Sequence, residues 1–177
     1  MERKVKRSKM NVNYVDAVLH DIDKLKVSSL YAWPIKLIFL WSIMDAWAYS
    51  KSKLDRPRER VNYLRKLKTE GNIFFECYEG VMNENGYNSV LNIVKSIDLK
   101  ISPAGVVNDI VRYYPNNIGQ DMIELIYQIR NKIVHGEWFV DWSTDADNSV
   151  KVSVIQVVCT FFDKWVHLAH NRGAFNS

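Results

Sequence analysis

Residues 35–50 form the segment that most constrains the fold, because apolar side chains occupy nearly every side of the helix they would make. The segment follows Pro34, which fits the first turn of a helix, where its missing N–H costs nothing. Its most apolar run, 37–44, is far shorter than the roughly 20 residues that a membrane span requires. A helix of this kind has to be covered on all sides, so we expect it to lie buried at the centre of the core.

Helical periodicity extends over most of the remaining chain, because apolar residues recur every three or four positions. Further helices are expected at residues 12–26, 72–82, 90–97, 104–114, 118–135 and 150–170, with a short one around Val61, Leu64 and Leu67. The last segment begins with alternating valines and could start as a strand. Because its continuation is helical, we predict helix throughout, and an all-α bundle with inserted short helices.

The length of 177 residues, with 47% hydrophobic and 25% charged residues, is that of an ordinary folded domain. We expect one domain over residues 12–170, a basic flexible tail at 1–11 and a second tail at 171–177. No apolar stretch directly follows the basic N-terminal residues, so they are not expected to be a signal peptide. They are either a solvated tail or an electrostatic arm for RNA.

The charge of the chain and its potential metal ligands bear on which partners and cofactors it could bind. The net charge of +4 and the isoelectric point near 9.0 are compatible with an acidic partner but specify none. Cys77 and Cys159 match no metal spacing, so we predict that both are reduced and buried in a cytoplasmic protein. His167 and His170 lack an evident third ligand and are interpreted as helix-end residues. We therefore expect no metal and no cofactor, and the sequence also contains no Gly-rich phosphate loop.

Three polar residues interrupt the apolar pattern near the end of the helix expected at 118–135. Arg130 carries a planar fork of donors that suits a phosphate. Asn131 follows it directly, and His135 has a side chain that changes charge near neutral pH. Gly136 is placed as a C-terminal stop. A phosphate clamp and a proton shuttle on a rigid helix end are the parts that phosphodiester cleavage needs without a metal.

The spacing of Arg130 and His135 sets a geometric condition on such a site. Residues five apart on a regular helix point about 140° apart around its axis, so the two side chains do not share one face. Either the last turn unwinds at His135, which Gly136 would permit, or the functional pair is assembled across two protomers.

The sequence Arg-Asn-Lys-Ile-Val-His-Gly at 130–136 resembles the Arg-x4-His motif of the HEPN superfamily. Members are all-α proteins, many of them ribonucleases in toxin–antitoxin, phage-defence and CRISPR-associated systems. The motif lies at the end of a penultimate long helix, followed by a loop and a final helix, as in the family. Asp45 resembles the acidic residue that many members carry on an early helix. The resemblance covers about residues 34–50 and 118–168.

The resemblance implies a homodimer in which both copies of the motif face one cleft. It also implies metal-independent RNA cleavage by the ribose 2′-OH, which leaves a 2′,3′-cyclic phosphate. His135 would move the proton, and Arg130 would hold the phosphate and stabilise its developing charge. Asn131 would position the phosphate or the imidazole, and Asp45 would orient Arg130 or tune its setting. Besides RNA, an antitoxin or a defence-system protein is an expected partner.

Three further residues are candidate RNA contacts: Trp138, Lys132 and Arg65. Trp138 lies just beyond the motif and is a candidate stacking partner for a base. Arg65 belongs to the basic face of the short helix around Val61, which is either a solvated face or part of an RNA track.

Other interpretations of the motif remain open. Arg130 could form a helix-end salt bridge with Glu124 or Asp45, and His135 could contact the last carbonyls of its helix. The chain could then be a non-catalytic HEPN-like module that binds a nucleotide, an RNA or a protein. It could also be a helical interaction protein in which the motif arose by chance.

Overall fold

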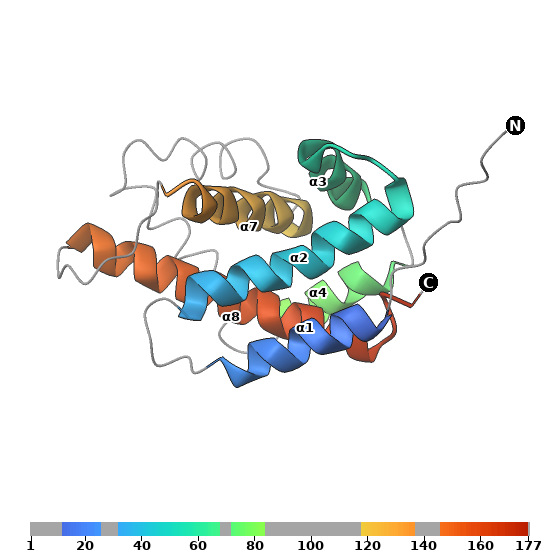
Figure 1. The fold of residues 1–177 in the computed structure, drawn as a ribbon, viewed down its shortest axis with the longest axis horizontal. Helices are drawn as coiled ribbons and strands as arrows, with labels where there is room; N and C mark the ends of the chain where they lie inside the picture. Colours follow the sequence, from blue (N-terminus) through green and yellow to red (C-terminus); the bar gives the residue numbers. More distant parts are fainter. Residues whose placement is uncertain (1–11, 26–31, 68–71, 84–117, 137–145, 177) are drawn as a thin grey trace, which may run out of the picture.

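The computed structural model describes residues 12–25, 32–67, 72–83, 118–136 and 146–176. These residues form helices and no strand (Figure 1). The helices are α1 (Val12–Lys24), α2 (Ala32–Ser52), α3 (Pro57–Lys66), α4 (Ile73–Asn83), α7 (Ile118–Val134) and α8 (Ala146–Asn171). The all-α prediction is therefore confirmed for this part of the chain. The helices expected at 90–97 and 104–114 lie outside the described residues.

Helix α2 lies at the centre of the bundle, as its apolar sequence predicted. It packs against α1, α3, α7 and α8, and crosses the middle of the molecule in Figure 1. Leu37, Leu40 and Met44 are fully buried. One side of the helix nevertheless remains open, because Ile35, Phe39 and Tyr49 are each more than two-fifths exposed. The expectation that α2 is covered on all sides is therefore wrong for the side that carries these three residues.

Helix α8 packs against α2 and α4 and supplies much of the core. It begins at Ala146, so its valine-rich start is helical and not a strand. The segment Val152–Asn171 is long and apolar enough to cross a membrane by length and composition alone. About half of that segment is buried inside the bundle. Its apolar side chains are used in packing between helices.

Aromatic residues fill the space between α4 and α8. Trp165 is fully buried and stacks on Phe74 with ring centroids 4.2 Å apart. Its indole Nε1–H donates a hydrogen bond of 2.6 Å to the backbone oxygen of Phe74. Tyr78 meets the same indole edge-on at 4.9 Å. The single polar atom of this large side chain is thus satisfied inside the core.

The packed structure extends beyond residue 170, where the sequence suggested that a tail begins. Gly173 adopts a φ of 75°, and the N–H of Ala174 donates to the oxygen of Ala169 at 2.9 Å. This turn folds Phe175 back onto the core, where it is 3% exposed and meets Trp47 edge-on at 5.5 Å. Residues 172–176 therefore belong to the domain.

Candidate functional site

The C-terminal end of α7 carries the motif residues, and its helical hydrogen bonding continues to His135. The N–H of His135 donates to the oxygen of Asn131 at 2.9 Å, which is the bond of a regular α-helix. Helix α7 ends at Val134, and the chain turns away at Gly136, which has a φ of 73°. The predicted glycine stop is therefore confirmed, and the last turn does not unwind at His135. Arg130 and His135 consequently point to different sides of α7.

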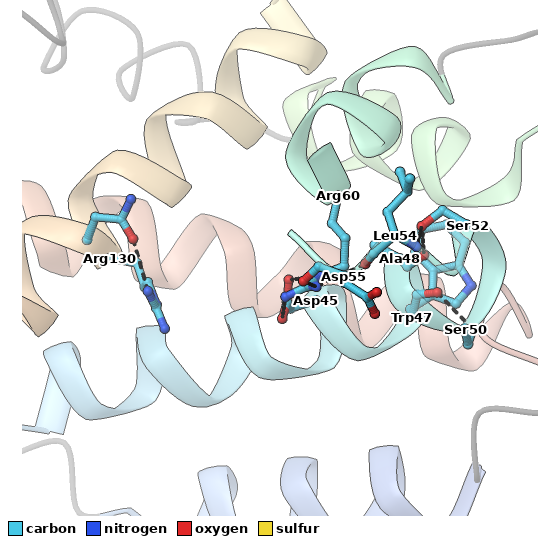
Figure 2. A network of polar contacts seen from close by, with 10 residues as sticks. Asp45, Trp47, Ala48, Ser50, Ser52, Leu54, Asp55, Arg60 and Arg130 are labelled. Atoms are coloured by element: carbon cyan, nitrogen blue, oxygen red, sulfur yellow. Dashed lines mark hydrogen bonds and ion pairs between the residues drawn. The ribbon is translucent and has the colours of Figure 1, made fainter. Parts of the chain in front are cut away.

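Arg130 is partly buried where α7 passes over α2. Helix α7 runs antiparallel to α2, so its C-terminal end lies over the N-terminal half of α2 (Figure 1). The Nη1–H of Arg130 donates to Oδ1 of Asn131 at 2.9 Å (Figure 2). Its Nε is buried and has no hydrogen-bond partner among the described residues. Asn131 thus holds one branch of the guanidinium while another donor stays unused.

The two carboxylates that the sequence offered to Arg130 are bound to other arginines. Asp45 forms a two-bonded pair with Arg60, at 2.7 Å from Nε and 2.8 Å from Nη2. Glu124, which is 5% exposed, pairs with Arg58. Within the described part of the chain, Arg130 forms no ion pair with a carboxylate. A guanidinium in this state is suited to bind an external anion.

The position of Asp45 corrects the expectation that this residue orients Arg130. Figure 2 shows Arg130 and Asp45 at separate places along α2. Arg60 also donates to the backbone oxygens of Leu54 at 3.0 Å and Asp55 at 2.6 Å. The hydrogen bond to Asp45 and its negative charge raise the pKa of Arg60 despite partial burial. Asp45 therefore fixes the turn between α2 and α3 through Arg60.

Replacing Asp45 by alanine is expected to lower the free energy of unfolding by about 2 kcal/mol, because it leaves the partly buried Arg60 without its carboxylate. Urea unfolding followed by circular dichroism measures this loss. Asp55→Ala is the matched control, since Arg60 contacts only the backbone oxygen of Asp55. Equal stability of the Asp45 variant and the wild type would contradict the assigned role.

Two of the candidate RNA contacts can be located in the structure. Arg65 has a side chain that is only 14% exposed and pairs with Glu124 at 3.5 Å, so it faces α7 and not an open surface. Lys132 is partly buried in the last turns of α7. Trp138 lies outside the described residues. The basic face of α3 is thus largely used for ion pairs within the bundle, through Arg58, Arg60 and Arg65.

His135 is exposed beside Val134 at the open end of α7. An exposed imidazole can exchange protons with solvent or with a bound substrate. The described residues contain no group of three or more His, Cys, Asp or Glu that could hold a metal ion. The chemistry that the described groups can supply at this end is anion binding by Arg130 and proton transfer by His135.

Comparisons with protein-family models, with curated proteins and with solved structures found no match to this chain. The resemblance to the HEPN superfamily therefore rests on the motif and on its place at the end of a long helix in an all-α bundle.

The sequence interpretation missed the arginines that bind Asp45 and Glu124. One signal was present, because the basic residues of 57–66 do not all lie on one face: at about 100° per residue, Arg60 points to nearly the opposite side of the helix from Arg58. Some of them therefore had to point toward the bundle, where only a carboxylate could compensate their charge. Which carboxylate each would meet depends on how α2, α3 and α7 cross.

Proposed function

We propose that this protein is a metal-independent endoribonuclease of the HEPN type that acts as a homodimer. The observation that carries the proposal is the state of Arg130. Its guanidinium is partly buried, is steadied by Asn131 and has no carboxylate partner among the described residues. A phosphate of RNA would supply the missing negative charge.

The proposed reaction follows from the chemistry of the two side chains. His135 removes the proton from a ribose 2′-OH, and the freed oxygen attacks the adjacent phosphorus. Arg130 binds the non-bridging oxygens and stabilises the charge that grows on them. The P–O bond to the 5′-oxygen then breaks, and an imidazolium returns a proton to that oxygen. The products are a 2′,3′-cyclic phosphate and a 5′-hydroxyl end.

The regular end of α7 favours a site assembled across two protomers. Arg130 and His135 of one chain point to different sides of the helix, so one protomer does not direct both at a single phosphate. A two-fold arrangement would bring Arg130 of one copy toward His135 of the other. Exposed apolar side chains at this end of the bundle, Ile35, Phe39 and Val134, supply surface for such contact.

The biological setting of the proposal comes from the HEPN resemblance. Toxin–antitoxin and phage-defence systems use such ribonucleases, so an antitoxin or a defence-system protein is the proposed regulatory partner. The proposed location is the cytoplasm, where RNA substrates are found.

A second candidate function is a non-catalytic HEPN-like module that binds RNA, a nucleotide or a protein. The exposed side chains of Ile35 and Phe39 favour it, because an open apolar surface suits a protein partner as well as a second copy of the chain. This candidate predicts binding without cleavage.

The deciding experiment is incubation of the purified full-length protein with labelled RNA in the presence of EDTA. We expect cleavage products with 2′,3′-cyclic phosphate ends, and no cleavage by a folded Arg130→Ala/His135→Ala double variant. Identical product yields from both proteins would overturn the ribonuclease proposal. RNA binding by the wild type without cleavage would establish the binding module instead.

A further inference from the structure

Two histidines of α8 face two aspartates of α1. Nε2 of His170 lies 2.8 Å from Oδ1 of Asp16, and Nε2 of His167 lies 3.6 Å from Oδ1 of Asp23. The two aspartates are exposed, whereas the histidines are partly buried beneath α1. Both contacts join elements at opposite ends of the sequence and lie apart from the motif of α7.

His167 is also the middle member of a chain of charged groups that links three helices. Its Nδ1 lies 2.9 Å from the backbone oxygen of Asp163 and 3.2 Å from Oδ1 of the same residue. A proton on Nδ1 is therefore donated within α8. Oδ2 of Asp163 pairs at 2.7 Å with the ammonium of Lys36 on α2. Lys36 is only 8% exposed. With Nδ1–H committed to Asp163, Nε2 gains a proton toward Asp23 only when the imidazole is cationic.

The surroundings of His167 favour its charged form. The hydrogen bond to Asp163 raises the pKa of His167 against the opposing effect of burial. Burial alone would raise the pKa of Asp163, but the hydrogen bonds from His167 and Lys36 outweigh it and lower that pKa. At the end of α8, Arg172 is paired with Glu76 of α4 at 2.8 Å.

Apolar anchorage of α1 is limited to one stripe. Val15, Leu19 and Ile22 are buried, and the hydroxyl of Tyr14 lies 3.0 Å from Oγ of Ser42. With 13 residues, α1 is short enough that a helix of its length is only marginally stable outside a protein. Its attachment is therefore sensitive to modest changes in the contacts that hold its polar side.

We propose that α1 is a proton-controlled latch, closed by the ion pair of His167 with Asp23. Below the ordinary pKa of histidine the pair of His167 with Asp23 is complete and α1 is held to α8. As the pH rises through the raised pKa of His167, the cation is lost and the contribution to stability goes with it. Helix α1 then opens more often, and its apolar stripe and the core beneath it become accessible.

Hydrogen–deuterium exchange of the full-length protein tests the latch. The α1 peptide is compared with an α2 peptide in the same sample, after correction for the intrinsic pH dependence of exchange. Between about pH 6 and about pH 8, we expect the opening of α1 relative to α2 to increase about fivefold. In a His167→Gln variant, α1 should open as often at the lower pH as the wild type does at the higher.

Two controls keep the test decisive. His20→Gln changes an exposed histidine of α1 and should leave the fivefold response intact. Asp23→Asn removes the exposed partner without touching the core, and should abolish the response even if the histidine variant does not fold. A wild-type opening ratio that is independent of pH, or a response that survives the aspartate variant, would overturn the proposal.

Discussion

Replacing His135 by alanine is expected to slow RNA cleavage by about a thousandfold, which is within the range that a general acid or base contributes. The structure supports a pure effect on chemistry, because the side chain of His135 is exposed at the end of α7 and makes no core contact. The unfolding midpoint should therefore stay unchanged. Single-turnover cleavage in EDTA, with saturating protein, separates this loss from any change in RNA binding.

Replacing Arg130 should slow RNA cleavage strongly as well. Comparing alanine with lysine at this position shows whether the two parallel donors of the guanidinium are needed or only its positive charge. We expect Arg130→Ala to lose at least about a hundredfold in rate. Arg130→Lys should recover little of it, because an ammonium does not reproduce two parallel donors. His20→Ala and Arg56→Ala are the matched controls, since both residues are exposed. Loss of activity in these controls equal to that of the site variants would contradict the assignment.

Mixing the two inactive proteins tests the assembly of the site. If Arg130 and His135 come from different protomers, a dimer of one Arg130→Ala chain and one His135→Ala chain retains one intact site. An equimolar mixture should then recover about a quarter of the wild-type activity after the subunits exchange. No recovery in a mixture shown to contain the mixed dimer would mean that the pair acts within one chain.

Truncation of Trp165 to alanine is expected to cost about 4 kcal/mol of unfolding free energy, the largest effect on stability in the described core. The side chain is fully buried, stacks on Phe74 and gives its only N–H to the backbone. Removing it leaves a large cavity between α4 and α8 that the helices have no means to close. Urea unfolding followed by far-ultraviolet circular dichroism measures the change without depending on tryptophan fluorescence.

A conservative variant resolves this cost into its parts. Trp165→Phe keeps an aromatic ring on Phe74 but removes the N–H, and should cost about 2 kcal/mol. Tyr49→Ala, which truncates an aromatic ring that is 44% exposed, should cost less than about 1 kcal/mol. A Trp165→Ala protein as stable as the Tyr49→Ala control would show that the aromatic cluster does not carry the core.

Local patterns in the sequence were sufficient to predict the helices. Periodicity placed α1, α2, α4, α7 and α8 within a few residues of their observed ends, because each helix buries one stripe or, for α2, more than one side. Gly136 predicted the end of α7 for an equally local reason, since glycine accepts the positive φ that closes a helix. The buried end at Phe175 was missed because a single aromatic residue after a glycine carries no periodic signal.

The same distinction between local sequence and tertiary packing applies to the candidate site. The sequence by itself determined which residues share the end of α7, the helical stop behind them and the angle of about 140° between Arg130 and His135, because all three follow from the geometry of one helix. Only the tertiary structure decided that Asp45 belongs to Arg60 and Glu124 to Arg58, and that Arg130 is left without either. Ion pairs join residues far apart in the chain, so their partners are chosen by how whole helices cross, and that choice is made by the packing of the core.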